Sequence, residues 1–192
     1  TNKKFKKKTK KINKDLKILN IGRLTHQKDH MTLLRSLKLL KESTIRFKAN
    51  IIGGGYNYDI LKEYIKTHQL QKEIKLLGYK KNAHKFMNKA NLFVLSSKYE
   101  GLPNVLIEAQ AMGVPVVSSD AGGAGETFVD GESGFLVKRP SVENLTDAVL
   151  KIVNNSDFQV SAKIIAKNHV RQHFSLDSMH LTLEKILFEV IE

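Results

Sequence analysis

A small cluster of charged residues follows the first apolar segment of the chain. Arg23 comes directly after Gly22, and Lys28 lies five residues later, between a predicted strand and a predicted helix. An arginine offers a planar fork to phosphate oxygens and a lysine offers a compact positive charge, so together they suit a diphosphate. The alternative is that both residues are solvated cations of a loop that binds no ligand. Taken alone, this cluster favours the alternative.

Two carboxylates flank the start of another predicted helix. Glu100 precedes this helix and Glu108 lies about one turn inside it, so both side chains could face one ligand. Ionised carboxylates only accept hydrogen bonds, and the vicinal hydroxyls of a sugar donate them. Between the glutamates, the first amides of the helix should be unpaired donors that suit phosphate. These amides belong to Asn104, Val105 and Leu106. A capping acid plus a surface glutamate is the alternative, which fits Glu100 poorly.

Glycine-rich turns follow two other predicted strands. Gly54 is the centre of a run of three glycines, and three more glycines lie between Asp120 and Glu126. Glycine lets the backbone come close to a ligand, and the start of the helix after the first run favours an anion. The first run is not GxGxxG. Either run is also explained by a turn or a flexible connection.

Apolar and amphipathic segments alternate along the chain. Short apolar segments predict strands at residues 17–22, 47–53, 73–78, 91–96, 114–118 and 134–137. Helical spacing predicts helices at residues 30–42, 58–70, 82–89, 104–112, 142–154, 158–173 and 176–191. This order predicts an α/β fold, a Rossmann-like, doubly wound parallel sheet of about six strands, covered on both faces. Its ligands would bind outside the carboxyl ends of the strands, where the four clusters should lie.

The positive charge is concentrated at the start of the chain. The 192 residues carry a formal net charge of +13, and eight lysines lie among residues 1–14. This segment is predicted to be a basic flexible arm or linker, followed by one domain over residues 15–192. Adhesion of the arm to an anionic membrane is an alternative, whereas no nucleic acid is expected, because no aromatic ladder follows. Since the chain has no Cys and no long apolar run, we expect a cytoplasmic location, with the inner membrane face as a peripheral contact.

Two histidine pairs have the i, i+4 spacing that can bind zinc on a helix. They are His26 with His30 and His169 with His173. Neither pair has a third ligand or an HExxH pattern, so we expect no metal site.

Together the clusters resemble the motifs of the retaining glycosyltransferases of family 4, also called group 1, which have the GT-B fold. The family pattern G-R-L-x-x-x-K matches Gly22 to Lys28, and E-x7-E matches Glu100 to Glu108. The pattern D-x-G-G-x-x-E matches residues 120–126, and residues 131–137 are similar to a hairpin that usually follows. One departure is Asp29, where the family often has glycine. An acid beside a diphosphate would be unfavourable unless it points away.

The resemblance covers roughly residues 16–154 and implies the C-terminal, donor-binding half of a GT-B enzyme. Such a domain binds a nucleotide diphosphate sugar and uses neither a metal nor another cofactor. The resemblance assigns Arg23 and Lys28 to the diphosphate, Glu100 to the sugar hydroxyls and Glu108 to the ribose. The substrate-binding positions it implies are Gly22, Gly54, Leu77, Tyr79, Gly101, Leu102, Asn104, Val105, Leu106 and Glu108.

The resemblance also implies what this domain needs as partners. With the missing N-terminal domain of the same enzyme, it would transfer the sugar with retention to a growing polysaccharide or a lipid-linked glycan of bacterial type. Without that domain the chain should be inactive. The base, the sugar and the acceptor stay open.

Three other functions compete with this interpretation. A nicotinamide dehydrogenase would need GxGxxG after the first strand, which ends instead in Gly-Arg-Leu. A nucleotide-sugar epimerase of related fold would also bind a nucleotide sugar, but the spacing E-x7-E disfavours it. A basic polyanion-binding module would depend on residues 1–14, and its binding would fall steeply with salt.

Overall fold

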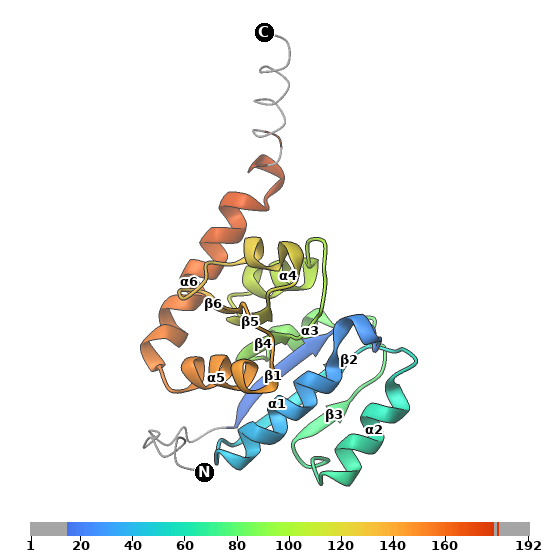
Figure 1. Ribbon diagram of the computed structural model, residues 1–192. Coiled ribbons are helices and arrows are strands. Elements are labelled where there is room, and N and C mark those ends of the chain that lie inside the picture. Colours follow the sequence, from blue (N-terminus) through green and yellow to red (C-terminus); the bar gives the residue numbers. More distant parts are fainter. Residues whose placement is uncertain (1–14, 179, 181–192) are drawn as a thin grey trace.

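The computed structural model describes residues 15–178 and 180, and a six-stranded parallel sheet forms its centre (Figure 1). The strands are β1 (Leu16–Ile21), β2 (Phe47–Ile52), β3 (Ile74–Leu76), β4 (Leu92–Leu95), β5 (Val116–Ser119) and β6 (Gly134–Val137). Their order is β3-β2-β1-β4-β5-β6, so the chain winds outward to β3 and then returns to the other side of β1. The predicted Rossmann-like, doubly wound α/β fold is therefore confirmed.

Helices connect the strands and cover the sheet. They are α1 (His30–Glu42), α2 (Tyr58–Thr67), α3 (His84–Met87), α4 (Asn104–Ala111), α5 (Val142–Val153) and α6 (Ser156–His173), with two 3₁₀ helices, η1 (His26–Lys28) and η2 (Gly122–Thr127). Two hydrophobic cores result: one includes side chains of α1, α2 and α5, and the other those of α3 and α4. No helix within residues 15–178 and 180 is long and apolar enough to cross a membrane.

The predicted elements lie close to the observed ones. Every predicted strand and the six helices up to residue 173 are present, with ends that differ by a few residues. The third strand is the shortest, because Gly78 adopts a left-handed φ of 66° beyond it and the backbone turns away. The helix predicted at residues 176–191 falls mostly outside the described residues, as does the whole basic arm at residues 1–14.

Two local predictions need correction after β5. The glycine-rich segment, predicted as a turn with a flexible connection as the alternative, forms the 3₁₀ helix η2, in which Ala124 and Thr127 are buried. The predicted hairpin at residues 131–137 is wrong, because β6 pairs with β5 in parallel along its whole length. Parallel neighbours need a crossover between them, and η2 is part of that crossover.

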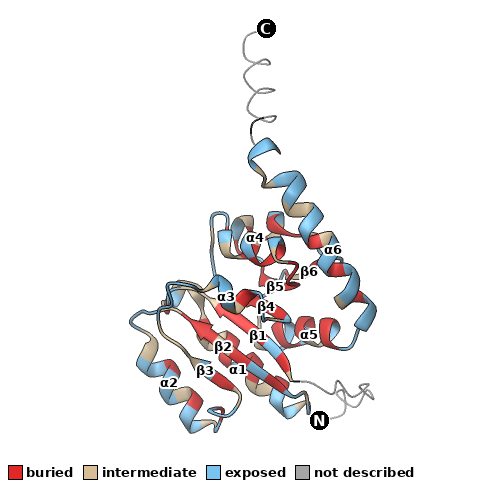
Figure 2. Ribbon diagram, turned by 180° about the vertical axis from the view of Figure 1, so that it is seen from behind, coloured by how far each residue is buried: buried red, intermediate tan, exposed pale blue. Residues whose placement is uncertain are grey.

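The sequence predicts a sheet that is covered on both faces. In the structure, one face is left partly uncovered by the helices. Lys17, Lys48 and Lys75 are exposed on β1, β2 and β3, although each has a buried neighbour on its strand. Figure 2, seen from behind, shows these strands in front of α1. The short helix α3 covers only part of this face, because it has four residues. An exposed strip therefore remains at the amino ends of these strands.

Candidate functional site

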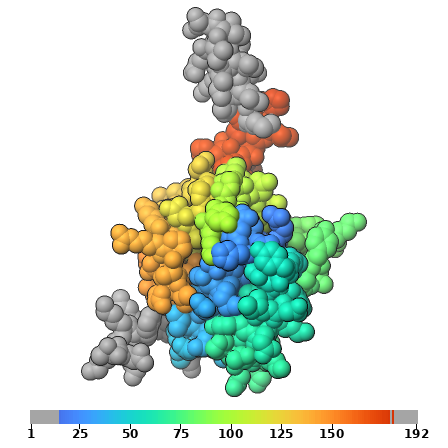
Figure 3. Space-filling model, turned by 45° about the vertical axis from the view of Figure 1, so that its right-hand side comes forward, coloured from blue at the N-terminus to red at the C-terminus, as the bar shows by residue number. Residues whose placement is uncertain are grey.

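The sheet switches direction between β1 and β4, which pair with each other although two strands separate them in the chain. The loop after β1 carries Lys28 and the loop after β4 carries Glu100. In the space-filling view the blue segment after β1 lies directly beside the yellow-green segment after β4 (Figure 3). The sequence placed these clusters on opposite sides of one crevice, and the structure brings them into contact. This is where a doubly wound sheet binds its ligand.

A short ion pair joins the two clusters. Nζ of Lys28 lies 2.5 Å from Oε1 of Glu100, and the two side chains are only 16% and 9% exposed. The hydroxyl of Ser97 donates to the same carboxylate oxygen at 2.6 Å. A charge-assisted pair with restricted solvent access holds both side chains in fixed positions. The site thus contains a positioned cation and a positioned acceptor side by side.

Further hydrogen bonds tie the two loops together. The side chain of Gln27 donates to the carbonyl of Tyr99 at 2.9 Å, and the carbonyl of Gln27 accepts from the amide of Lys98 at 2.8 Å. The hydroxyl of Ser96 donates to the carbonyl of Lys28 at 3.0 Å. The backbone that carries Lys28 is therefore anchored to the loop that carries Glu100.

Asp29, the departure from the family pattern, has a structural role. Its φ of 43° and ψ of 49° are left-handed, which explains why glycine suits this position. Its carboxylate caps α1 by accepting from the amide of Thr32 at 3.3 Å and from the Thr32 hydroxyl at 2.8 Å. The acid is thus committed to the start of α1.

Arg23 is exposed, and no described residue forms an ion pair with it. Its loop is held by the glycine run: the amide of Leu24 donates to the carbonyl of Gly54 at 2.9 Å. A Cβ on Gly53, whose φ is 147°, would overlap the carbonyl oxygen of Gly22. Gly53 therefore allows two loops to pack closely, whereas Gly54 faces open space.

The start of α4 differs in one respect from the sequence prediction. Three unpaired amides were expected, but the amide of Leu106 donates to the carbonyl of Pro103 at 2.9 Å. Its prediction as a free donor is wrong, because the first turn of the helix tightens to an i→i+3 bond. The amides of Asn104 and Val105 have no acceptor among the described residues. Two donors therefore remain available at this helix start.

Glu108 is exposed, in contrast to the half-buried Glu100. Gly101 and Leu102, between the glutamates, are also exposed, and the glycine carbonyl accepts from the amide of Gly123 at 2.8 Å. The η2 segment thus supports the loop of Glu100 from the far side. The predicted pair of carboxylates consists of one anchored group and one solvent-facing group.

The residues predicted to contact a base stand at the far end of the same edge. Leu77 is half-buried, and its amide donates to the carbonyl of Ile51 at 2.9 Å. Tyr79 is 80% exposed. The carbonyl of Gly78, between them, accepts from the amide of Gly53 at 3.0 Å. The strand order therefore places these residues, the glycine run and the Lys28 loop along one edge of the sheet.

A buried histidine lies beneath the Lys28 loop. His30 is 1% exposed, and its Nε2 lies 2.9 Å from Oδ1 of Asn20. The side-chain Nδ2 of Asn20 donates to the carbonyl of Val94 at 2.8 Å, which leaves Oδ1 as the acceptor, so Nε2 of His30 carries the proton and donates to Oδ1. Burial, with the charge of Lys28 as a smaller cause, lowers the pKa of His30 from 6.5 to about 4, against the opposing effect of Asp29. The neutral ring thus links α1 to β1 and β4.

The sequence interpretation missed Ser97 and the Asn20–His30 pair. A serine directly after a buried strand, three residues before Glu100, was the available signal for Ser97. An asparagine inside an otherwise apolar strand was the signal for Asn20, because a buried amide needs partners. Both residues lie beneath the switch point and not at its surface.

The histidine pairs engage other partners. Nε2 of His26 lies 2.7 Å from Nζ of Lys98, and Nε2 of His169 lies 3.0 Å from the carbonyl of Glu126. The His169 ring packs against that of His173 at 4.7 Å between centroids, with the ring planes tilted by 43°. Within residues 15–178 and 180 no group of three or more His, Cys, Asp or Glu side chains is placed to hold a metal ion.

The comparison with protein families decides which kind of enzyme has this site. A family model described as glycosyl transferases group 1 matches residues 1–169. This chain belongs to the group 1 glycosyltransferases. The motifs around Lys28 and Glu100 therefore belong to a glycosyltransferase.

Curated relatives of this glycosyltransferase chain act in glycan assembly. It is 34% identical over 159 residues to N-acetylgalactosamine-N,N'-diacetylbacillosaminyl-diphospho-undecaprenol 4-alpha-N-acetylgalactosaminyltransferase of Campylobacter jejuni, covering 82% of this chain and 43% of that protein. It is 28% identical over 183 residues to the capsular polysaccharide biosynthesis glycosyltransferase CapM of Staphylococcus aureus, covering 91% and 48%. The chain thus spans less than half the length of these two relatives.

Solved structures show the same domain. A mutant of S. aureus TarM, crystallised with fondaparinux, alpha-GlcNAc-glycerol and UDP, superposes with a TM-score of 0.83 at 26% identity, over 90% of this chain and 35% of that one. HepE of Anabaena with UDP and glucose superposes with a TM-score of 0.79 at 22% identity, over 90% and 48%, and supports the fold alone. The predicted Rossmann-like domain of the GT-B type is therefore confirmed.

Proposed function

We propose that the chain binds a nucleotide diphosphate sugar across the carboxyl edge of its sheet, as the donor half of a retaining family 4 glycosyltransferase. The observation that carries this proposal is the pair of Lys28 and Glu100 at the switch point, 2.5 Å apart. A donor of this class has a charged centre and neutral diols at both ends, so it needs cations in the middle and acceptors on either side. The UDP present in the TarM structure, which is 26% identical to this chain, supports this proposal.

Each part of the donor has a matching group along the edge. The diphosphate would contact Arg23, Lys28 and the two open amides at the start of α4. The sugar hydroxyls would bind Glu100, and the ribose hydroxyls would bind Glu108. Leu77 and Tyr79 would flank the base.

The substrate-binding set that we propose along this edge also includes the backbone segments at its rim. They are Gly22, Gly54, Gly101, Leu102, Asn104 and Val105, while Leu106 supports the helix start with its own amide already bonded.

In the proposed reaction, the bond from the anomeric carbon to the phosphate oxygen breaks while the acceptor oxygen forms a new bond on the same face. The proton of the acceptor hydroxyl passes to the departing phosphate. Arg23 and Lys28 would offset the negative charge that develops on this leaving group. Neither a metal nor another cofactor takes part in this scheme.

The acceptor in this proposal is a growing polysaccharide or a lipid-linked glycan. It is motivated by the relatives, one of which is named for a diphospho-undecaprenol substrate and another for capsular polysaccharide. The partner domain of the same enzyme would supply the acceptor contacts. The enzyme would act in the cytoplasm, in peripheral contact with the inner face of the membrane.

A thermal-shift panel tests the donor proposal. UDP-, GDP- and ADP-sugars are added to the chain, and a ligand at about one hundred times its Kd should add roughly 3 kcal/mol to the free energy of unfolding. We expect one base to raise the melting temperature, and we expect Lys28→Ala to reduce this rise by about half or more, as a tenfold or greater loss of affinity requires. A panel in which no nucleotide sugar has any effect would overturn the proposal.

A further inference from the structure

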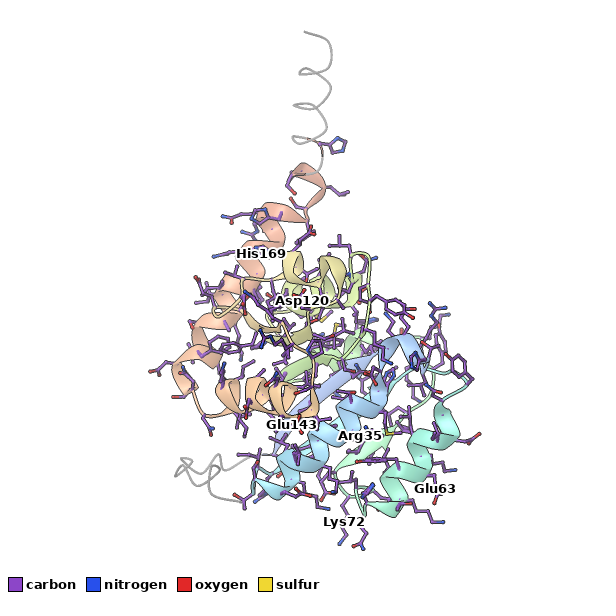
Figure 4. All side chains as sticks on the ribbon, viewed as in Figure 1. Arg35, Glu63, Lys72, Asp120, Glu143 and His169 are labelled. Carbon is purple, nitrogen blue, oxygen red and sulfur yellow. The ribbon has the colours of Figure 1, made fainter. Side chains whose placement is uncertain are left out.

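A second, strongly basic surface lies at the opposite end of the sheet from the donor site. A cavity of about 510 Å³ opens there, at the amino ends of β1 and β2 on the face that the helices leave uncovered. Figure 4 labels Lys72, just before β3, and Asp120, just after β5, toward opposite ends of the sheet. We call this cavity the basal groove. Its cationic lining residues are Lys17, Arg46, Lys48 and Lys89.

Two of these lysines face each other across neighbouring strands. Lys17 of β1 is the direct register partner of Lys48 of β2, so both side chains project from the same face. Like charges placed opposite each other destabilise a sheet. On the next strand Lys75 pairs with Asn50, another lining residue, and adds a third cation to this face. A bound anion would offset the repulsion between these lysines.

Most of this charge is not neutralised by the protein. Among the described residues, only Arg46 of the groove forms an ion pair, with Asp15 at 2.9 Å. Lys48 donates to the carbonyl of Lys72 at 2.7 Å, which holds its ammonium group without cancelling its charge. No described carboxylate lies within ion-pair distance of Lys17 or Lys89. The groove therefore presents an excess of positive charge to solvent.

The groove also has an apolar floor. Leu19, Phe86 and Ala90 line it beneath the cations. An apolar surface ringed by lysines suits a membrane interface, where anionic headgroups meet the cations and the upper acyl chains meet the apolar atoms. Asp15, the first described residue, itself lines the groove, and in the sequence it directly follows the segment 1–14 with its eight lysines.

We infer that the basal groove docks the domain on an anionic phospholipid surface. This inference rests on one part of the proposed function, the peripheral contact with the membrane. It assigns that contact to a defined surface of the folded domain. Because the donor site lies at the other end of the sheet, the domain can bind the membrane and a donor at the same time. Either property can fail without the other.

Vesicle sedimentation tests the inference with the whole chain. Vesicles of phosphatidylcholine alone are compared with vesicles that also contain phosphatidylglycerol. Lys17→Gln/Lys48→Gln should bind the anionic vesicles roughly thirtyfold more weakly, or about fivefold for each lysine. The matched control is Lys62→Gln/Lys66→Gln, which removes two exposed charges from α2 on the opposite face and should keep the wild-type partition.

Three outcomes would overturn the inference. They are equal losses in both double variants, wild-type binding that does not depend on phosphatidylglycerol, and binding of the groove to polyuridine RNA in preference to vesicles. Folding is checked by the melting temperature, which should not fall in Lys17→Gln/Lys48→Gln because the change removes a repulsion. If that variant nevertheless fails to fold, Lys17→Glu alone must still weaken vesicle binding more than Lys62→Glu. The thermal shift with nucleotide sugars should be unchanged in every groove variant.

Discussion

Nζ of Lys28 and Oε1 of Glu100 are 2.5 Å apart, although 72 residues separate them in the chain. The pair is possible because β1 and β4 are neighbours in the sheet. The cation proposed for the diphosphate is therefore already held in position by the carboxylate proposed for the sugar. Binding of a donor would replace part of this ion pair with contacts to phosphate and hydroxyl groups.

Replacement of Lys28 by alanine should weaken binding of a nucleoside diphosphate by about tenfold or more, since one charge-assisted hydrogen bond contributes roughly 1.5–3 kcal/mol. Titration calorimetry with UDP, GDP and ADP measures the effect. Lys62→Ala, an exposed change on α2, is the control and should bind normally. Wild-type affinity in Lys28→Ala would show that the diphosphate binds elsewhere.

The two glutamates should respond differently to alanine substitution. Glu100→Ala should spare the free nucleotide, because Lys28 loses its anionic partner but keeps its charge, and should weaken only the sugar-bearing form. Glu108→Ala should weaken both forms, because both contain the ribose. Calorimetry with the nucleotide and the nucleotide sugar separates the two roles. If both variants change the two affinities in the same way, the proposed division of roles is wrong.

Neighbouring glycines provide a matched pair for the loop geometry. Gly53→Ala places a Cβ on the carbonyl oxygen of Gly22 at a φ of 147°, so it should cost roughly 1–3 kcal/mol or more and displace the Arg23 loop. Gly54→Ala meets nothing within 4 Å and should change stability little. Urea unfolding of both variants, followed by nucleotide titration of each, makes the comparison. Equal stabilities would contradict the close approach of these two loops.

Stability should depend on pH through His30. Its pKa is about 4 in the folded protein and 6.5 as its ordinary value, so the unfolded chain binds more protons between these two pH values. The contribution of the neutral ring is complete above about pH 6.5 and is lost as the pH falls toward about 4. Urea unfolding at about pH 7.5 and about pH 5 should differ by roughly 2 kcal/mol through this residue.

The control for this pH effect is a second histidine. His30→Gln should remove this part of the pH dependence, whereas His84→Gln, an exposed change on α3, should retain it. A pH dependence that is identical in the wild type and His30→Gln would exclude the buried ring as its cause.

The chain by itself should bind a donor without transferring the sugar. It covers 43% and 48% of two curated relatives, and the acceptor contacts are proposed to come from the partner domain. Radiolabelled donor, incubated with membrane extracts as acceptor, measures transfer, and the thermal shift confirms that the same sample binds. Turnover by the chain alone would contradict this prediction.

The local sequence determined the elements of this protein and the chemistry of its motifs. Apolar segments such as residues 92–95 and 116–119 can be recognised as strands because their burial requires no distant information. The alternation with helices then implies a parallel sheet, and the motif clusters taken together, among them Glu100 to Glu108, carry the resemblance to a glycosyltransferase family. The types of group at the candidate site were therefore predictable.

Only the tertiary structure decided which of these groups contact one another and which hydrogen-bond donors remain free for a ligand. The contact of Lys28 with Glu100, the Ser97 bond beneath it and the buried Asn20–His30 pair depend on strand order, which brings distant loops together. The hydrogen bond from the amide of Leu106 to the carbonyl of Pro103 depends on the geometry of the first helical turn, which the residue types do not reveal. The register that sets Lys17 beside Lys48 follows from the pairing of two whole strands, because each side chain faces the side its strand imposes.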